Sequence, residues 1–553
     1  MRTDKGKGTS AGKGDGVATG PGLAAVEGGL GGAGFPAVAH DERRRAAPTT
    51  AAHAADREGR CAGRKAFIGK ELNRHDPRAG VTFRAIMLSL TLIALLTAAD
   101  ATDWSRFRGP NGSGVAESTG LPDSFGPAQN VIWKKTLPAG YSSPIISAGH
   151  IFVTAVENDK LFTIALDLKT GDEKWRRESP RDRKEKLDKR NGPASPTAVA
   201  DGKNVFVFFP DYGLISYDFK GKERWRTPLG PFNNIYGMAA SPMLVEDKVI
   251  LVCDQASGSY IAAFTAATGK EVWRKPRPEA ISGHSTPVLY QPKGVASPLI
   301  LAPGSLRMDA YSPKDGTSVW WVNSLPGEMK SGAVLQGDMV FVSGFNTPQN
   351  DPGAHVAVPP FDEMLAKLDA DKNGLLSTEE VTDKQTKDMF FFIDLNSNGA
   401  IDAAEWRMYM ANSASENGLL AFRGNGEGDM TTKGLVWKYQ RSVPQLPTVL
   451  SYRDVLYMIN DGGVLTTFNP QTGAVLKQAR LRGAVDSYYA SPVAADGKVY
   501  IASRSGIVAI LKAGGDQEVL SVNKLDEEIY ATPAIVGNRI YLRTANTLYC
   551  FGL

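Results

Sequence analysis

The stretch Ala165-Leu-Asp-Leu-Lys-Thr-Gly-Asp-Glu-Lys-Trp175 combines an alternating strand, a Thr-Gly turn and a second short strand that ends on tryptophan. Gly171 supplies the positive φ that a tight hairpin needs, and Trp175 is large enough to fill a gap between packed sheets. Copies of this stretch occupy residues 216–225, 263–273, 310–320 and 467–477. The chain is therefore expected to be built from repeats of one small β unit.

A second signature precedes each copy. It is a small residue followed by proline, at the start of an alternating strand. The proline, or the residue that aligns with it, stands at positions 144, 196, 242, 287, 333, 448, 492 and 533. Most gaps are about 40–50 residues, the length of a four-stranded propeller blade. The gap from 333 to 448 is about 70 residues longer than its neighbours and predicts an insertion. The predicted fold is an all-β, eight-bladed β-propeller with a small inserted domain.

The two ends of the chain are expected to close the ring of blades. The last copy, residues 531–553, stops one strand short of a complete unit. The segment Asn130 to Thr136 has the character of the missing outer strand. Pairing the two ends would remove the open sheet edges that a β-protein must otherwise protect.

These units resemble the eight-bladed PQQ-repeat propellers, a family that includes quinoprotein alcohol dehydrogenases and BamB-type assembly lipoproteins. The resemblance covers roughly residues 104–553 and rests on the pattern Ala-x-Asp-x-x-Thr-Gly-x-x-x-Trp. This pattern is specific for the fold and not for the quinone. The dehydrogenases of the family imply a carboxylate base, a calcium-binding Glu/Asn/Asp set, a Trp floor and an adjacent cysteine pair. Neither that cysteine pair nor the lipid-anchor cysteine of BamB-type proteins is found in this sequence.

The N-terminal part has the composition of a targeting region. Residues 1–80 are rich in Gly, Ala and Arg and are expected to be a disordered or mis-assigned extension. Residues 81–101 are interpreted as a secretory signal, because the apolar run 88–96 is followed by Ala99-Asp-Ala101. The alternative is a true disordered extension with a buried apolar strand. The run is too short for a transmembrane segment. The signal predicts a periplasmic or secreted protein.

Charge and cysteine content exclude several classes of protein. The net charge of +4 comes from residues 1–86, which hold 15 Lys/Arg against 9 Asp/Glu. The remaining chain is close to neutral, so nucleic-acid binding is not expected. Cys253 and Cys550 belong to distant blades and are expected to be buried free thiols.

The insertion, residues 347–417, contains two matches to the calcium-binding EF-hand loop, residues 369–380 and 394–405. Oxygen ligands fall at the required positions, and a glutamate able to bind through both oxygens closes each loop. Only 13 residues separate the loops, so the intervening helices must be shortened or merged, which favours a structural calcium site over a sensor. The predicted Ca²⁺ ligands are Asp369, Asp371, Asn373, Leu375 (through its backbone), Ser377, Glu380, Asp394, Asn396, Asn398, Ala400 (through its backbone), Asp402 and Glu405.

A second candidate site is the mouth of the central channel, where the connections entering the innermost strands gather. Three residues before each proline position stand Tyr141, Pro193, Ala239, His284, Lys330, Gln445, Tyr489 and Tyr530, with Tyr236, Tyr488 and Asp486 nearby. An aromatic and polar ring suits a small ligand or a peptide. The candidate binding residues are Tyr141, His284, Lys330, Gln445, Tyr489 and Tyr530. The alternative is that the tyrosines pack between blades. No carboxylate stands in this series, and His284 and Lys330 have no evident acid or base partner.

Two charged segments receive structural interpretations. The segment Asp103 to Gly114 is expected to be a strap outside the first blade, with Arg106 and Arg108 as surface arginines and an anion site as the alternative. The mixed-charge run Arg176 to Lys189 is expected to be a solvated loop or short helix, with a binding loop as the alternative.

The sequence predicts an exported, calcium-binding propeller with a non-catalytic binding or scaffold role in the cell envelope. The propeller is assigned to residues 102–346 and 418–553, and a monomer is expected. The partner at the channel face would be a protein or a glycan. The alternatives are a calcium-dependent PQQ quinoprotein acting on an alcohol or sugar, and a polysaccharide-binding module. Quinone binding is possible but not expected.

Overall fold

The fold is described from a computed structural model that covers residues 103–292, 295, 297–346, 354 and 357–553. These residues belong to one of two compact units of the chain, residues 86–553. The predicted extension 1–80 and signal 81–101 lie outside the described residues. No helix of the described part is long and apolar enough to cross a membrane.

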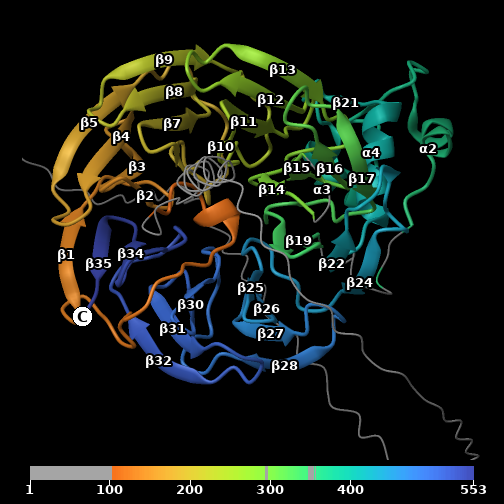
Figure 1. The fold of residues 1–553 in the computed structure, drawn as a ribbon. Helices are drawn as coiled ribbons and strands as arrows, with labels where there is room; N and C mark the ends of the chain where they lie inside the picture. The colour runs from red at the N-terminus through yellow and green to blue at the C-terminus, as the bar shows by residue number, and fades with distance from the viewer. Residues whose placement is uncertain (1–102, 293–294, 296, 347–353, 355–356) are drawn as a thin grey trace, which may run out of the picture. The chain divides into compact units, whose positions relative to one another are not determined.

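Eight antiparallel sheets are arranged as the blades of a propeller, so the predicted fold class is confirmed (Figure 1). The strands of each blade follow one another from the channel outward. Blade 1 contains β2 (Ile145–Ser147), β3 (His150–Glu157), β4 (Lys160–Asp167) and β5 (Glu173–Ser179). Blade 2 contains β6 (Val199–Ala200), β7 (Asn204–Phe209), β8 (Gly213–Asp218) and β9 (Glu223–Pro228). Blade 3 contains β10 (Met243–Val245), β11 (Lys248–Cys253), β12 (Tyr260–Thr265) and β13 (Glu271–Pro276). Blade 4 contains β14 (Val288–Tyr290), β15 (Leu299–Pro303), β16 (Arg307–Tyr311), β17 (Ser318–Asn323) and the added parallel strand β23 (Gly428–Asp429).

The second half of the ring continues the same order. Blade 5 contains β18 (Val334–Gln336), β19 (Met339–Gly344), β22 (Gly418–Arg423) and β24 (Leu435–Tyr439). Blade 6 contains β25 (Leu450–Tyr452), β26 (Val455–Ile459), β27 (Val464–Phe468) and β28 (Val475–Arg480). Blade 7 contains β29 (Val493–Ala495), β30 (Lys498–Ala502), β31 (Ile507–Lys512) and β32 (Val519–Lys524). Blade 8 contains β33 (Ala534–Val536), β34 (Arg539–Arg543), β35 (Thr547–Phe551) and β1 (Val131–Thr136).

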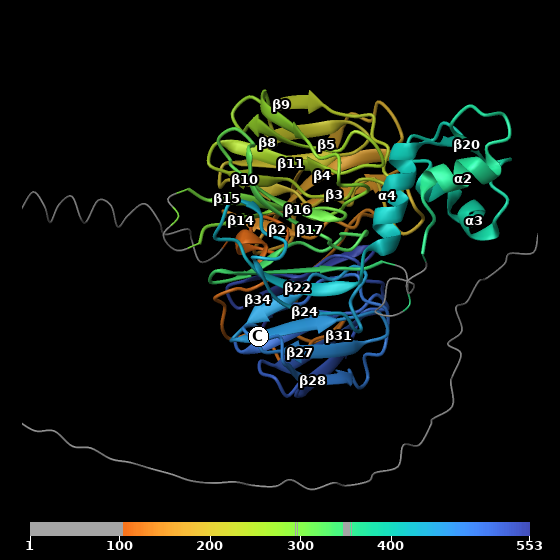
Figure 2. The ribbon, with the colours of Figure 1, turned by 90° about the vertical axis from the view of Figure 1, so that its right-hand side faces the viewer.

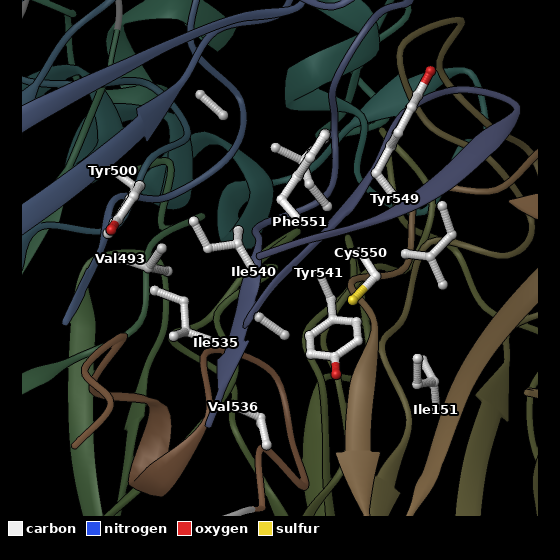
Figure 3. Close-up of a cluster of buried hydrophobic side chains, with 14 of the residues drawn as sticks. Ile151, Val493, Tyr500, Ile535, Val536, Ile540, Tyr541, Tyr549, Cys550 and Phe551 are labelled. Atoms are coloured by element: carbon white, nitrogen blue, oxygen red, sulfur yellow. The ribbon is translucent and has the colours of Figure 1, made fainter. Parts of the chain in front are cut away.

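The ring closes through strand β1, which comes from the start of the propeller and completes the last blade. β1 pairs antiparallel with β35, and Lys134 lies opposite Tyr549. The closure that the sequence predicted is therefore confirmed. Hydrophobic side chains of blades 1, 7 and 8 pack together at this seam, as Figure 3 shows for Ile151, Tyr500 and Tyr541.

The Gly and Trp of the repeated stretch contact each other across neighbouring blades. Trp225 of blade 2 lies on Gly269 of blade 3, where a Cβ atom would collide with the indole ring. Gly269 also has a φ of +70°, so both the turn and the contact require glycine. The indole Nε1 of Trp225 donates to the carbonyl of Ala266, at 2.8 Å. The same packing of an indole ring on a glycine joins Trp133 to Gly171, Trp175 to Gly221, Trp273 to Gly316, Trp320 to Gly424 and Trp437 to Gly473.

A circle of hydroxyl groups joins the inner strands around the channel. In seven of the eight blades a Ser or Thr stands two residues before the inner strand and accepts a hydrogen bond from the preceding blade. The N–H of Ser491, for example, donates to Thr532 Oγ1 at 3.0 Å, and the N–H of Thr532 donates to Ser143 Oγ at 3.0 Å. The circle consists of Ser143, Thr197, Ser241, Thr286, Thr448, Ser491 and Thr532. In blade 5 this position is Gly332, so the backbone N–H of Thr286 has no hydroxyl acceptor there.

This circle corrects the repeat alignment in two blades. In blade 2 the equivalent residue is Thr197, which follows Pro196, and in blade 6 it is Thr448, which follows Pro447. The equivalent of the strand-opening proline is therefore residue 198 and not 196 in blade 2, and residue 449 and not 448 in blade 6. The hydroxyl, and not the proline, is the constant feature of the step, because it makes the hydrogen bond between blades.

Thr532→Val is expected to lower the free energy of unfolding by about 2 kcal/mol, because the buried N–H of Ser491 loses its acceptor while side-chain volume is kept. Urea unfolding of the purified chain measures this change. Thr432 is exposed, and Thr432→Val is the matched control, with an expected change below about 0.5 kcal/mol. A Thr532→Val variant as stable as wild type would contradict a stabilising role for the circle.

The N-terminal segment is placed differently from the prediction, because it crosses the channel instead of lying outside blade 1. Trp104 pairs with Ile146 of blade 1, and the carbonyl of Ser105 accepts from Ala200 of blade 2. Further along, the carbonyl of Gly114 accepts from Ala494 of blade 7 at 2.8 Å. In Figure 1 this orange segment, with the short helix η1 (Pro110–Gly112), runs across the middle of the ring. One end of the channel is therefore closed by the chain itself.

Arg106 and Arg108 are buried inside this plug, so their prediction as surface arginines was wrong. Arg106 Nη2 donates to the carbonyl of Pro287 at 2.5 Å. Arg108 donates to the carbonyls of Thr448 and Val449, at 3.2 and 3.0 Å, as well as to two carbonyls of its own turn. Burial lowers the pKa of Arg108 to about 9 and that of Arg106 to about 10, so both remain charged at neutral pH. Both guanidinium groups donate to backbone carbonyls.

The insertion between β19 and β22 is mainly helical. It contains α2 (Phe361–Leu368), β20 (Leu376–Ser377), α3 (Lys384–Ile393), β21 (Ala400–Ile401) and α4 (Ala403–Ala414). β20 and β21 pair antiparallel, with Leu376 opposite Ile401. In Figure 2 the three helices lie at the side of the propeller, next to blades of the ring. A single helix, α3, occupies the short stretch between the two acidic loops.

Both cysteines of the propeller are buried and free, as predicted. Cys253 belongs to blade 3, and burial raises the pKa of its thiol to about 12. Cys550 belongs to blade 8, where burial raises the pKa of its thiol to about 11. Both therefore act as packing groups at neutral pH.

Candidate functional site

The channel contains a cavity of about 230 Å³ on the side opposite the plug. Its floor is formed by the circle of hydroxyl groups and by Phe107, which stands between the two buried arginines of the plug. All six candidate binding residues line it, namely Tyr141, His284, Lys330, Gln445, Tyr489 and Tyr530. Ala239 and Tyr236 also line it, whereas Tyr488 is fully buried in the core between blades 6 and 7.

Three tyrosines form one wall of the cavity by packing on each other. The rings of Tyr141 and Tyr530 are stacked with centroids 4.3 Å apart, and Tyr489 lies 5.4 Å from Tyr530. The hydroxyl of Tyr530 donates to Glu528 Oε2 at 2.7 Å, and Glu528 also pairs with Arg504 at 3.0 Å. Burial, followed by the hydrogen bond to Glu528, raises the pKa of Tyr530 to about 12. This wall is aromatic, and the Tyr530 hydroxyl stays protonated at neutral pH.

The opposite wall carries charges that are paired within the protein. The loop after β5 contributes Asp188, Arg190 and Asn191. Asp188 belongs to the run Arg176 to Lys189 that was predicted to be solvated, and the other two residues follow that run. Arg190 contacts Asp188 through two hydrogen bonds, of 2.6 and 3.1 Å. Lys330 forms an ion pair with Glu328. The expectation that Lys330 would have no acid partner was therefore wrong, and a carboxylate from outside the series, Asp188, also lines the cavity. Both partners were missed because they lie outside the repeat position used in the prediction.

His284 is neutral and has free hydrogen-bonding capacity. Within the described part of the chain, neither of its ring nitrogens has a hydrogen-bond partner, and both are covered. Burial, together with the charge of Lys330, lowers the pKa of His284 to about 3. A neutral imidazole presents one donor and one acceptor. Without an acid or base partner, this histidine is suited to binding and not to proton transfer.

His284 is expected to make the fold less stable in acid. The unfolded chain binds a proton at His284 as pH falls below about 6.5, whereas the folded chain does so only near pH 3. Stability is therefore fully present above pH 6.5 and is lost as pH falls, by about 2 kcal/mol at pH 5. Denaturant unfolding of wild type and His284→Gln between pH 7 and 5 measures the difference. Parallel stability curves for the two proteins would contradict this expectation.

The two acidic loops of the insertion have the same backbone hydrogen-bond pattern. The first-position carboxylates of Asp369 and Asp394 each accept from two backbone N–H groups, at residues 373 and 374 and at residues 398 and 399. The closing glutamates Glu380 and Glu405 each accept from two N–H groups of their own loop. Both loops turn on a glycine of positive φ, 80° at Gly374 and 86° at Gly399. The two loops therefore have the same local structure.

Carboxylates converge in the first loop. Oxygens of Asp369, Asp371 and Glu380 lie within 4.8 Å of one another. In the second loop Glu405 is buried, and burial, together with the charges of Asp402 and Asp394, raises its pKa. Calcium prefers such sets of carboxylate, amide and backbone oxygens. The residues present fit this ion, which would also neutralise the charge of the buried glutamate.

Comparison with known proteins agrees with the repeats. The model of a PQQ-repeat family, described as outer membrane protein assembly factor BamB, matches residues 128–287, 165–348 and 307–553. The chain belongs to this family. No curated protein matches the chain.

Three solved structures illustrate what the chain is similar to. A europium-containing methanol dehydrogenase is 11% identical, with 84% of this chain and 100% of that chain covered and a TM-score of 0.53. The quinohemoprotein alcohol dehydrogenase ADHIIG from Pseudomonas putida HK5 is 13% identical, with 82% and 80% covered and a TM-score of 0.51. BamB from Moraxella catarrhalis is 13% identical, with 76% and 99% covered and a TM-score of 0.48. At these identities the likeness shows the fold alone.

The cavity of this PQQ-repeat protein does not fit the quinone set that the dehydrogenases imply. Asp188 is the one carboxylate among its described lining residues, and it is already paired with Arg190. No tryptophan or cysteine belongs to that lining. The two cations that could bind the carboxylates of the quinone, Arg190 and Lys330, are neutralised by protein carboxylates.

Proposed function

We propose that this chain is an exported calcium-binding propeller whose channel cavity binds a protein or glycan partner without converting it. The observation that carries the proposal is the cavity itself. It brings the six candidate residues together, yet its charged groups are paired and its histidine is neutral. Such a lining provides aromatic surface and hydrogen bonds for recognition but no activated nucleophile or base.

Calcium binding is supported by the identical pattern of the two loops and by the β20–β21 pairing that links them. Position 7 of each loop, Leu375 and Ala400, supplies only a backbone carbonyl in this assignment. Each loop has three carboxylates, which favours moderate affinity, in the range that millimolar extracellular calcium would fill. Export is supported by the sequence of residues 81–101 and agrees with the outer-membrane description of the family.

Glu405→Gln is expected to weaken calcium binding at the second loop by at least tenfold, since even partners that only orient a ligand cost about 10–100-fold in metal affinity. Glu380→Gln is the matched change in the first loop. Calorimetric titration of calcium should give two sites in wild type, one in each single variant and none in the double variant. A double variant that binds calcium like wild type would place the sites elsewhere.

A direct test separates binding from quinone-dependent catalysis. The purified chain is mixed with PQQ and calcium, desalted, and its absorbance spectrum recorded. The expected spectrum is that of protein alone. Stoichiometric retention of quinone would overturn the proposal and make the cavity an oxidoreductase site, for which an alcohol or sugar would be the substrate class.

A further inference from the structure

The segment Asn233 to Tyr236 lies between the second acidic loop and the cavity. At one end, Asn233 Nδ2 donates to the carbonyl of Leu395 at 2.8 Å. Leu395 stands between Asp394 and Asn396, the first two proposed ligands of that loop. At the other end, Tyr236 lines the cavity. Residues 233–236 therefore lead from the acidic loop, at the residue between two proposed ligands, to the cavity.

A second contact joins the same two places. The ring of Phe392, on α3, lies 6.2 Å from the ring of Tyr236. α3 ends at Ile393, so Phe392 is two residues before Asp394. Any change in the position of Asp394 therefore reaches Tyr236 by two routes, the helix end and the Leu395 carbonyl.

Tyr236 contacts the polar groups of the cavity wall. Its hydroxyl donates to Glu328 Oε1 at 3.0 Å, and Glu328 also pairs with Lys330. The Lys330 ammonium lies 5.0 Å from the centre of the Tyr236 ring, and the Arg190 guanidinium lies 5.6 Å from it. The ring of His284 lies 5.9 Å from that of Tyr236. A shift of Tyr236 would change the surroundings of every charged or titratable group on this wall.

A second arrangement of the cavity wall would allow His284 to form hydrogen bonds. Its two ring nitrogens are covered and have no partner within the described residues, which is a costly state for buried polar atoms. The Tyr236 ring lies beside that of His284, with centroids 5.9 Å apart, so a shift of Tyr236 would change the surroundings of the two nitrogens on the wall of the cavity. The wall can therefore exchange an internal contact for ligand contacts.

We propose that metal occupancy of the second loop controls the cavity wall, through the contacts of Phe392 with Tyr236 and of Leu395 with Asn233. Binding of Ca²⁺ fixes Asp394 and Asn396, and with them the end of α3 and the Leu395 carbonyl. This sets the position of Tyr236 and the access of ligand to His284. By linkage, a ligand that prefers the same position raises calcium affinity by the same factor. The inference rests on the calcium site of the proposed function.

The first loop provides an internal comparison. Within the described part of the chain, the side-chain hydrogen bonds of its Asn373, Ser377 and Glu380 stay inside the loop. Calcium at this loop is therefore not expected to act directly on the cavity, although the two loops share the β20–β21 pair.

Hydrogen–deuterium exchange of the purified chain with and without saturating Ca²⁺ tests the coupling. In wild type, calcium is expected to slow exchange severalfold in residues 394–405 and also in residues 233–238. Glu380→Gln keeps both effects, and Glu405→Gln loses both. Phe392→Ala keeps protection of 394–405 but loses most of it in 233–238. Phe391→Ala removes the neighbouring ring, which is 58% exposed, and keeps both effects.

The outcomes separate the coupling from the calcium site. Protection of 394–405 in wild type without any change in 233–238 overturns the coupling and leaves the calcium site standing. A Phe392→Ala variant with full protection of both segments also overturns it. Absence of calcium protection in both loops overturns the calcium site and the coupling together.

Discussion

Arg108→Ala is expected to lower the free energy of unfolding by about 3 kcal/mol, because it removes the charged donor to four backbone carbonyls inside the channel. The carbonyls of Thr448 and Val449 belong to blade 6, whereas Arg108 belongs to the segment that precedes blade 1. The guanidinium therefore ties the start of the propeller to the far side of the ring. Truncation leaves these acceptors in a space with few other donors.

Two variants show whether the guanidinium itself is responsible. Arg108→Lys is expected to recover less than half of the loss, because one ammonium cannot reach both sides of the turn as the planar guanidinium does. Arg441 is exposed, and Arg441→Ala should change stability by less than about 0.5 kcal/mol. Denaturant unfolding measures all three. An Arg108→Ala protein within about 0.5 kcal/mol of wild type would show that the plug contributes nothing to stability.

The blades could be predicted from the sequence because most repeats contain the same turn glycine and the same tryptophan. The glycine and tryptophan that meet between neighbouring blades, such as Gly269 and Trp225, leave a pattern that is readable without any alignment. The closing strand could be predicted for the same reason, since an incomplete last repeat requires a partner. Five of the six candidate residues that line the cavity were found because they share one position in the repeat, and Gln445 stands one residue before that position in blade 6.

The plug and the charged wall could not be predicted in this way. The acceptors of Arg108 are backbone carbonyls 340 and 341 residues away, and a carbonyl carries no residue-type signal. Isolated arginines are usually exposed, so the general rule led to the wrong prediction for this pair. Asp188, which lines the cavity, and Glu328, which pairs with a lining lysine, come from loops that lie outside the repeat pattern. Only the folded chain brings them beside Arg190 and Lys330.

Asp254→Ala is expected to be the most destabilising single substitution, lowering the free energy of unfolding by about 3–5 kcal/mol. Asp254 and Arg277 are each 1% exposed at the side chain and form two hydrogen bonds, of 2.7 and 3.1 Å. Burial disfavours the charge of Arg277, but Asp254 more than offsets this and raises the pKa of the guanidinium. Removing the carboxylate takes away the close partner of this buried cation, and the next carboxylate, Asp309, lies 3.9 Å from it.

The pair also supports the cavity wall, so its loss should have a local signature. The backbone carbonyl of Asp254 accepts from Asn234 Nδ2 at 2.9 Å, within the segment that leads to Tyr236. Its carboxylate lies so close to Gly283 that a Cβ there would approach Oδ2 to 2.7 Å, one residue before His284. Asp254→Ala is therefore expected to speed hydrogen exchange in 233–238 and 281–285 before global unfolding.

A double-mutant cycle separates the pair from its surroundings. Arg277→Met combined with Asp254→Ala should cost less than the sum of the two single changes, because the double variant buries no unpaired charge. The exposed pair Lys160–Glu178, with side chains 57% and 53% exposed, is the control, and Glu178→Ala should cost less than about 1 kcal/mol. Additive effects of the two buried substitutions would mean that Asp254 and Arg277 stabilise the fold independently. The His284 loop would then depend on packing and not on this ion pair.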